Sequence, residues 1–212
     1  MAIAINEDWQ QFVLTQGAVL DGEQLCFDQS PLLPAYGISD LSAFGVIRAC
    51  GEDARTLLQG QLTNDIQQVT PEHSQLSGLC SPKGRMLANF RIIERADALY
   101  LLLPAEQLPM VLQRLRMFVL RAQVELSDAS AELVRLGLFG DPVATLLPAQ
   151  APQSADGVLT LDELTLVRVA GTLPRYLVLA PAAAAQALWH KARAAGAEVT
   201  HHDTWPLLDI RS

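Results

Sequence analysis

The amino-acid sequence predicts an α+β protein of two similar subdomains with antiparallel or mixed sheets. Short apolar segments of strand length alternate along the chain with segments whose apolar residues recur at helical spacing. The clearest strand–helix–strand unit has its helix over 108–119. A second such unit follows in the other half, where Tyr176-Leu-Val-Leu-Ala-Pro-Ala echoes Tyr100-Leu-Leu-Leu-Pro-Ala. An internal duplication would explain the echo, and a chance match is the alternative interpretation.

The first half is predicted to begin with a loosely patterned N-terminal segment and to continue as a regular succession of strands and helices. Acidic residues after Gly51 suit the dipole of a short helix, and Gly60 ends it. The turn Ser81-Pro-Lys-Gly84 favours a tight reversal between two strands. The expected elements are a helix over 8–14, a strand over 42–50, a helix over 51–60, a hairpin of strands 74–80 and 85–94, a strand over 99–103, the helix over 108–119 and a strand over 123–126.

The second half is predicted to repeat this alternation after a boundary near 127–131, where small polar residues collect. Gly140-Asp141-Pro142 is typical of a helix start, because a proline in the first turn needs no backbone N–H partner. Gly196 is expected to end the alanine-rich helix. The expected elements are a strand over 132–139, a helix after it, a hairpin of strands 157–161 and 165–169, a strand from 176, a helix over 181–195 and a strand over 197–201.

These elements divide the chain into predicted domains 1–128 and 129–212, and we expect the second to be truncated because the chain stops inside an apolar pattern. Half of the residues are apolar and 18% are charged, below the roughly 25% of an average soluble domain. Such a composition is typical of a compact protein with one or two cores. The formal net charge of −8 repels phosphate backbones and therefore argues against direct nucleic-acid binding.

Other classes of protein are excluded by what the sequence lacks. Cys26, Cys50 and Cys80 form no C-x-x-C pair, which favours reduced thiols over a disulfide framework or a zinc site. The N-terminus has no basic region of a secretory signal, and the apolar runs are far shorter than the ~20 residues of a membrane-spanning helix. We therefore expect a cytoplasmic protein that does not contact membranes.

Common catalytic motifs are also missing. The sequence contains no G-x-S-x-G, H-E-x-x-H, phosphate-binding loop or dinucleotide-binding glycine cluster. The run His201-His202-Asp203 is unsuited to a metal, because adjacent residues on a strand point to opposite faces. No metal site is therefore predicted.

Two segments carry a denser set of polar groups. In the first, over 58–66, the amide, hydroxyl and carboxylate groups of Gln61, Thr63, Asn64 and Asp65 follow a helix end. Such groups can cap the helix and hold a loop, and they can equally recognise the hydrogen-bonding edge of a planar heterocycle. The sequence leaves both interpretations open.

The second segment covers 79–92. A strand from Arg85 onward would place Arg85, Asn89 and Arg91 on one face, near Lys83 in the turn. The opposite, core-facing set is Met86, Ala88, Phe90 and Ile92. The cationic strip is either a solvated sheet face or a recess for a small anion, since the arginine fork suits carboxylate or phosphate.

At these segments the sequence resembles the YgfZ-type folate-binding proteins, which are related to the aminomethyltransferase, or T-protein, of the glycine cleavage system. The resemblance rests on Gln59-Gly-Gln-Leu-Thr-Asn-Asp65, Ser81-Pro-Lys-Gly-Arg-Met-Leu-Ala-Asn89 and Trp205-Pro-Leu-Leu-Asp-Ile-Arg211. It implies ferredoxin-like, T-protein-like α+β subdomains around a folate site, followed by a β-barrel. These 212 residues contain no K-G-C-Y-x-G-Q-E segment, and we expect a truncated chain without the barrel.

The resemblance also implies a ligand, a role and a set of contacts. The ligand is tetrahydrofolate or a derivative, and the role is that of an accessory protein for iron–sulfur enzymes, including those that modify tRNA. The expected cofactor-binding residues are Gln61, Asn64 and Asp65 for polar contacts, Lys83, Arg85 and Arg91 for the anionic glutamate tail, and Asn89 and Arg168 for the wall.

Departures from the transferases argue against enzymatic activity. Ala88 and Asn89 stand where aminomethyltransferases carry acidic residues, so a charge that would stabilise the cationic amine is missing. Arg168 is retained, but the two glutamates of the adjoining transferase stretch are not. The alternatives are a folate-dependent aminomethyltransferase that has moved its acid and a non-catalytic protein-interaction scaffold.

Overall fold

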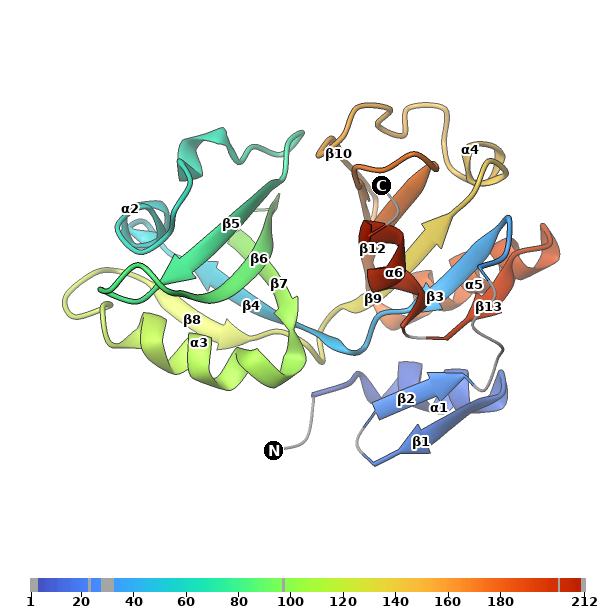
Figure 1. Cartoon of the computed structure of the whole chain (residues 1–212), viewed down its shortest axis with the longest axis horizontal. Coiled ribbons are helices and arrows are strands. Elements are labelled where there is room, and N and C mark those ends of the chain that lie inside the picture. The colour runs from blue at the N-terminus through green and yellow to red at the C-terminus, as the bar shows by residue number, and fades with distance from the viewer. Residues whose placement is uncertain (1–3, 23, 28–32, 97, 202, 211–212) are drawn as a thin grey trace. The chain divides into compact units, whose positions relative to one another are not determined.

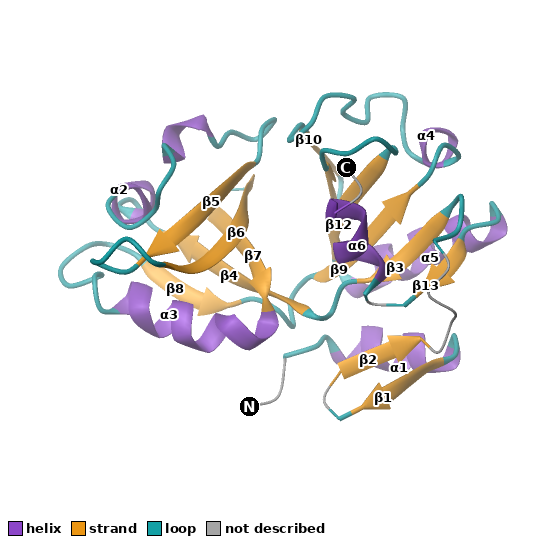
Figure 2. Ribbon diagram, viewed as in Figure 1, coloured by secondary structure: helices purple, strands orange, loops and turns teal. Residues whose placement is uncertain are grey.

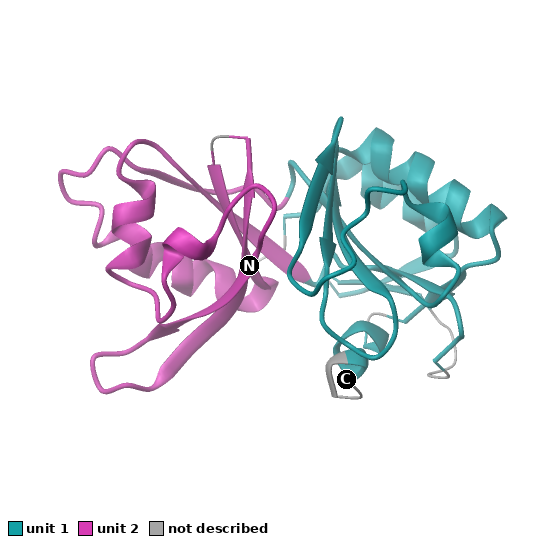
Figure 3. Cartoon of the chain, turned by 90° about the horizontal axis from the view of Figure 1, so that it is seen from above, with its two compact units in different colours: residues 1–43, 131–212 teal, residues 44–130 magenta. Residues whose placement is uncertain are grey.

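The computed structural model describes residues 4–22, 24–27, 33–96, 98–201 and 203–210 (Figures 1 and 2). The chain divides into two compact units, unit 1 with residues 1–43 and 131–212 and unit 2 with residues 44–130 (Figure 3). Both contain strands and helices, so the predicted α+β fold class is confirmed. Each unit has its own cluster of buried apolar side chains.

This division differs from the predicted domains 1–128 and 129–212 at the N-terminal end. Residues 1–43 belong to unit 1 because β3 (Gly37–Asp40) lies between β9 (Val134–Phe139) and β13 (Glu198–Thr200). Strand β3 is antiparallel to β9 and parallel to β13. Pairing between segments so distant along the chain leaves no local pattern in the sequence, which is why this N-terminal part was predicted with the wrong neighbours.

Unit 2 is a five-stranded antiparallel sheet with helices packed on one face. The strand order is β5-β6-β7-β4-β8. Helix α3 buries Leu108, Val111, Leu112 and Leu115, as the helical spacing predicts, although it ends at Arg116 rather than at 119. The elements are β4 (Phe44–Cys50), α2 (Ala54–Gln59), the 3₁₀ helix η1 (Ile66–Gln68), β5 (Gln75–Cys80), β6 (Met86–Arg95), β7 (Ala98–Pro104), η2 (Ala105–Gln107), α3 (Leu108–Arg116) and β8 (Glu125–Asp128).

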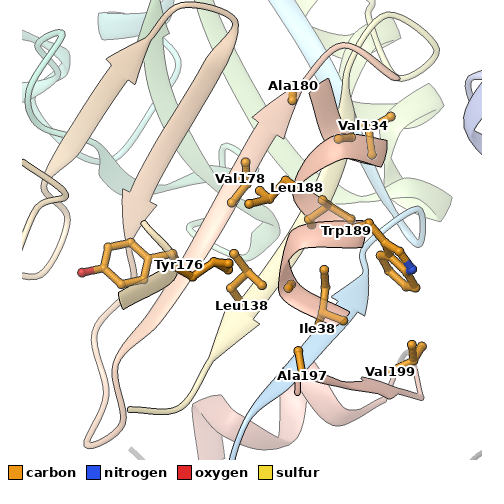
Figure 4. Packing of buried hydrophobic residues seen from close by; sticks show 14 of the residues in the cluster. Ile38, Val134, Leu138, Tyr176, Val178, Ala180, Leu188, Trp189, Ala197 and Val199 are labelled. Atoms are coloured by element: carbon orange, nitrogen blue, oxygen red, sulfur yellow. The ribbon is translucent and has the colours of Figure 1, made fainter. Parts of the chain in front are cut away.

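Unit 1 is built on a six-stranded mixed sheet in the order β10-β11-β12-β9-β3-β13. Helix α5 lies on one face and places Leu188 and Trp189 in the same buried cluster as Ile38, Leu138 and Val178 (Figure 4). The further elements are α1 (Glu7–Thr15), the two-stranded sheet of β1 (Ala18–Asp21) and β2 (Gln24–Phe27), α4 (Val143–Leu146), β10 (Val158–Leu161), β11 (Leu164–Arg168), β12 (Arg175–Ala180), α5 (Ala182–Ala194) and α6 (Thr204–Ile210). Strands β1, β2 and β3 and helix α6 were not predicted from the sequence.

The two units repeat one topology. The element order β4-α2-β5-β6-β7-α3-β8 of unit 2 returns as β9-α4-β10-β11-β12-α5-β13 in unit 1. The sheet orders also correspond, with β3 inserted between β9 and β13 in unit 1. The echo around Tyr100 and Tyr176 therefore marks equivalent strands, β7 and β12. A common origin of the two units by duplication stays a prediction. Such an origin requires the units to share one topology, and they do.

The N-terminal segment is held in unit 1 by aromatic side chains. Trp9 and Phe12 of α1 and Phe27 of β2 surround Trp189, with ring centroids 5.6–6.3 Å from that of Trp189. Asn6 caps α1 by accepting a hydrogen bond from the Trp9 backbone N–H at 3.0 Å. Aromatic pairs at these distances add to the free energy gained by burying their apolar area. Helix α1 and strands β1 and β2 therefore contribute side chains to the core of unit 1.

A buried carboxylate lies beside this cluster. Asp40 accepts hydrogen bonds from Trp9 Nε1 at 2.8 Å and from Ser42 Oγ at 2.8 Å. Burial raises the pKa of Asp40, while these hydrogen bonds and the positive charge of Arg135 offset part of the effect. Because the raised pKa applies only in the folded state, the folded protein holds this proton at pH values where the unfolded chain has lost it.

We expect Asp40→Asn to remove this pH dependence. The contribution of Asp40 to stability is fully present below the usual aspartate pKa and is lost as the pH rises through its folded value. The free energy of unfolding of the natural chain should therefore improve relative to Asp40→Asn as the pH falls from 7 toward 4, by about 1.4 kcal/mol for each unit of pKa displacement. Urea unfolding at several pH values measures this, and a difference independent of pH would contradict it.

Candidate functional site

The two polar segments meet at the edge of the sheet of unit 2. Residues 62–64 run along β5, which is an edge strand. Leu62 bridges to Leu79, the Thr63 N–H donates to the Gly78 carbonyl at 3.0 Å, and the Gly78 N–H donates to Thr63 Oγ1 at 2.9 Å. This segment satisfies backbone groups that an open edge would leave unpaired. It also fixes the first polar segment against the second.

Asn64 and Asp65 hold the same loop. Asn64 Nδ2 donates to the Leu76 carbonyl at 2.9 Å, and Asp65 Oδ1 accepts from the Gln67 N–H at 3.0 Å at the start of η1. Gln59 Oε1 accepts from the Ile66 N–H at 2.8 Å. The structural role that the sequence left open is therefore present for both residues. Contact of Asn64, Asp65 or the half-buried Gln61 with a ligand stays a prediction.

A β-bulge changes which side chains of β6 face the core. Ala88 pairs with Leu79, whereas Cys80 pairs with Met86, so Leu87 is an extra residue between the two pairs. Ala88, Phe90 and Ile92 lie in the core as predicted. Met86 is 65% exposed, so its predicted core position is wrong. The bulge turns Met86 to the opposite face of the sheet, which we call the outer face.

Gly78 allows close packing on the outer face beside Met86. Gly78 pairs with Asn89, and a Cβ atom at Gly78 would lie 3.3 Å from Met86 Cε and 3.4 Å from Thr63 Oγ1. The absence of a side chain at Gly78 thus lets the Met86 thioether and the Thr63 hydroxyl approach the buried backbone of β5. Met86 and Asn89 are both exposed on this face. Together they present a polarizable sulfur, which suits an aromatic ring, and an amide that can recognise its polar edge.

The cationic residues of the second segment are not equivalent. Lys83 and Arg85 are exposed at the β5–β6 turn, which is closed by the Ser81 N–H donating to the Arg85 carbonyl at 2.8 Å. Arg91 is buried on the outer face and donates through Nη1 to Ser74 Oγ at 2.8 Å. The predicted strip is therefore two exposed cations at the turn and a third that is part of the sheet.

Arg168 belongs to unit 1, whereas the other seven predicted site residues belong to unit 2. Its guanidinium lies over the Tyr176 ring, 5.6 Å from the centroid, and donates to the Val169 and Arg175 carbonyl oxygens. Burial raises the pKa of Tyr176, and the charge of Arg168 offsets part of this shift. The observed contacts of Arg168 are structural, and its role at a ligand stays a prediction.

The described part of the chain contains no group of three His, Cys, Asp or Glu residues that could hold a metal ion. His201 Nδ1 lies 3.5 Å from an oxygen of Asp203, and His202 lies outside the described residues. None of the described helices is long and apolar enough to cross a membrane.

The fold and these motifs define the class of protein. Residues 32–203 match the family of GCVT N-terminal domains, and the chain belongs to this family. Its fold is similar to that of glycine cleavage system aminomethyltransferase T from Bartonella henselae, with a TM-score of 0.78 at 16% identity over 97% of this chain and 62% of that one. The expected T-protein-like α+β fold is therefore confirmed.

Sequence similarity points to a narrower group. The chain is 30% identical over 181 residues to the tRNA-modifying protein YgfZ of Colwellia psychrerythraea, covering 84% of this chain and 55% of the relative. It is 27% identical over 178 residues to the protein of the same name from Vibrio vulnificus, with coverages of 84% and 53%. The chain thus spans about half the length of the curated relatives that it matches.

Sequence reasoning missed Gly78, Met86 and Ser74 as parts of this site. Gly78 lies in a segment that alternates like a strand, where a glycine can mark close approach of another group, so this signal was available. The bulge at Leu87 has no comparable sequence signal, because it depends on how the turn sets the register of the hairpin.

Proposed function

We propose that this chain is a folate-binding accessory protein, with tetrahydrofolate or a derivative as its ligand. The observation that carries the proposal is that Met86 and Asn89 are exposed on one face of the hairpin whose turn exposes Lys83 and Arg85. Family membership and similarity to the YgfZ proteins support it. Tetrahydrofolate, when bound, would supply one-carbon chemistry.

In this proposal different residues of the chain contact different parts of the ligand. Met86 contacts the face of the pterin ring, and the Asn89 amide pairs with its polar edge, with Gln61, Asn64 and Asp65 as further polar contacts. Lys83 and Arg85 bind the carboxylates of the glutamate tail. Arg91 is already engaged with Ser74, so it contributes positive charge rather than a new hydrogen bond.

We propose an accessory role rather than aminomethyl transfer. Ala88 faces the core and Asn89 carries no charge, so neither supplies the acid that the transfer requires. The name of the YgfZ relatives supports a role in tRNA modification, and we extend this to the maintenance of iron–sulfur enzymes in the cytoplasm. The net charge of −8 favours enzyme partners over direct contact with nucleic acid. Release of ammonia from an aminomethylated lipoyl carrier would instead identify a transferase.

Calorimetric titration with tetrahydrofolate tests the ligand and its orientation. We expect Lys83→Ala/Arg85→Ala to bind roughly tenfold more weakly, because charge-assisted hydrogen bonds to the tail are lost. Tetrahydropteroate, which lacks the glutamate, should bind the natural chain and this variant equally. Arg121→Ala, which removes an arginine elsewhere in unit 2, is the matched control. Unchanged tetrahydrofolate binding by the double variant would contradict the proposal that Lys83 and Arg85 bind the glutamate tail. Absence of tetrahydrofolate binding by the natural chain would favour the alternative of a non-catalytic protein-interaction scaffold.

A further inference from the structure

A cavity of about 400 Å³ lies in unit 1 between helix α5, the end of α4 and the β10–β11 hairpin, and we call it the α5 cavity. Its volume is within the range typical of small-molecule sites, which are lined mainly by apolar side chains. Among the described residues, none of those proposed to bind folate lines it. Six leucines line it, namely Leu146, Leu147, Leu161, Leu164, Leu166 and Leu188.

The floor of the α5 cavity is buried, whereas its mouth is open to solvent. Leu166 of β11 and Leu188 of α5 are buried, and Leu161 of β10 is 39% exposed at the mouth. Ala184 and Ala187 lie three positions apart on one face of α5, and their methyl groups are too short to fill the space between the helix and the hairpin. An apolar molecule in this space would remove aliphatic surface from water on several sides at once.

The charged groups of the lining lie at opposite ends of the α5 cavity. The acidic turn Asp162-Glu163 joins β10 to β11, and the first residue of β11 lies beside the end of β12, where α5 begins. Lys191 lies toward the other end of α5, where its Nζ donates to the Leu146 carbonyl at 2.8 Å. Seven residues of helix separate Lys191 from Ala184, which is about 10 Å at the rise of an α-helix.

The charges of the lining and of the whole chain favour a cationic ligand. The lining holds two acidic residues and one basic residue, and the chain has a formal net charge of −8, so the two have the same sign. Asp162 is exposed at the mouth, where it can pair with an ammonium group. Lys191 is farther from the turn than the Debye length of about 8 Å at physiological ionic strength, so its repulsion of that group would be screened.

An anionic ligand fits this arrangement less well. A carboxylate at the turn would meet the like charges of Asp162 and Glu163. A carboxylate at the other end would compete with the Leu146 carbonyl for the Lys191 ammonium group. The net charge of −8 would also oppose its approach. The lining therefore distinguishes between an apolar amine and an apolar acid of the same size.

We propose that the α5 cavity binds a small apolar molecule that carries one ammonium group. The apolar part of the molecule would lie between α5 and the hairpin, in contact with Leu166 and Leu188. Its ammonium group would pair with the Asp162 carboxylate at the mouth. The site belongs to unit 1 and shares no residue with the proposed contacts of folate in unit 2, so neither proposal depends on the other.

Octylamine, which is cationic at neutral pH, provides a probe for an NMR titration of the isotope-labelled chain. We expect saturable shifts of the amides of α5, β10 and β11, with a dissociation constant on the order of 1 mM, because a ligand with few non-hydrogen atoms gains limited binding free energy. Butylamine keeps the charge but loses four methylene groups, so it should bind more than about tenfold more weakly. Octanoate keeps the chain but reverses the charge, and it should bind at least about threefold more weakly.

Two variants locate the ligand in the cavity. Ala187→Leu should fill the cavity and abolish saturable octylamine binding without loss of fold, because leucine suits an exposed helix position. Ala194→Leu, at an exposed position of α5 outside the cavity, is its matched control. Asp162→Asn should weaken octylamine binding about threefold and leave octanol binding unchanged, since asparagine tolerates the φ of +50°. Glu198→Gln, at the opposite edge of the sheet, should leave both unchanged.

Three outcomes would overturn the proposal. Absence of saturable shifts with octylamine would show that the α5 cavity takes no such ligand. Equal octylamine binding by the natural chain and Ala187→Leu would place the ligand elsewhere on the molecule. Octanoate binding as tight as that of octylamine, or unchanged octylamine binding by Asp162→Asn, would contradict the assignment of the ammonium group to the acidic turn.

Discussion

Gly140→Ala is expected to destabilise unit 1 by roughly 3 kcal/mol or more, which is the range of severe backbone and steric strain. Gly140 has a φ of +105°, and a Cβ atom there would lie 2.1 Å from the Ala35 carbonyl oxygen and 2.9 Å from the Tyr36 Cα. Both contacts are with backbone, so no side chain can rotate away. The Gly140 N–H also donates to the Pro174 carbonyl at 2.8 Å, which prevents the turn from moving outward.

Tryptophan fluorescence during urea unfolding measures this loss, because Trp9, Trp189 and Trp205 all lie in unit 1. Gly196→Ala is the matched control. Gly196 also has a positive φ, +91°, but nothing lies within 4 Å of its Cβ position, so only the conformational cost of about 1 kcal/mol applies. Equal losses in the two variants would show that the close approach at Gly140 is not a constraint.

The role of Gly140 illustrates what local sequence patterns can predict. Gly140-Asp141-Pro142 correctly indicated a helix, and α4 begins directly after it at Val143. The close contact with the Ala35 carbonyl could not be predicted, because it depends on β3 reaching its place beside β9. Gly51 has the same role in unit 2, with a φ of +111° and a Cβ position 2.2 Å from the Gln123 carbonyl oxygen. The repeated topology thus includes the turn after its first strand.

The candidate site shows the same limit. Alternation placed Asn89 and Arg91 on one face of a strand, and the structure confirms that placement. Met86 was placed on the wrong face because the bulge at Leu87 shifts the alternation by one residue. The burial of Arg91 was also missed, since it depends on Ser74 at the far end of the neighbouring strand.

Trp189→Ala is expected to lower the stability of unit 1 by about 3–5 kcal/mol, the usual cost of removing a buried aromatic side chain. The indole is fully buried on α5 and contacts Trp9 and Phe12 of α1 and Phe27 of β2. The cavity left by alanine would therefore loosen α1 and β2 together with α5. Hydrogen exchange should show that amides of α1, β1 and β2 lose protection along with those of the six-stranded sheet of unit 1, whereas amides of the sheet of unit 2 keep more of theirs.

Trp189→Phe separates the effect of cavity formation from that of lost polar contacts. The Trp189 Nε1 atom is buried and has no hydrogen-bond partner among the described residues, so phenylalanine removes an unsatisfied donor while keeping most of the aromatic contact. We expect this variant to lose less than about 1.5 kcal/mol. If α1 and β2 kept their protection in Trp189→Ala, they would not share the core of unit 1, and the prediction that they belong with the first half of the chain would be restored.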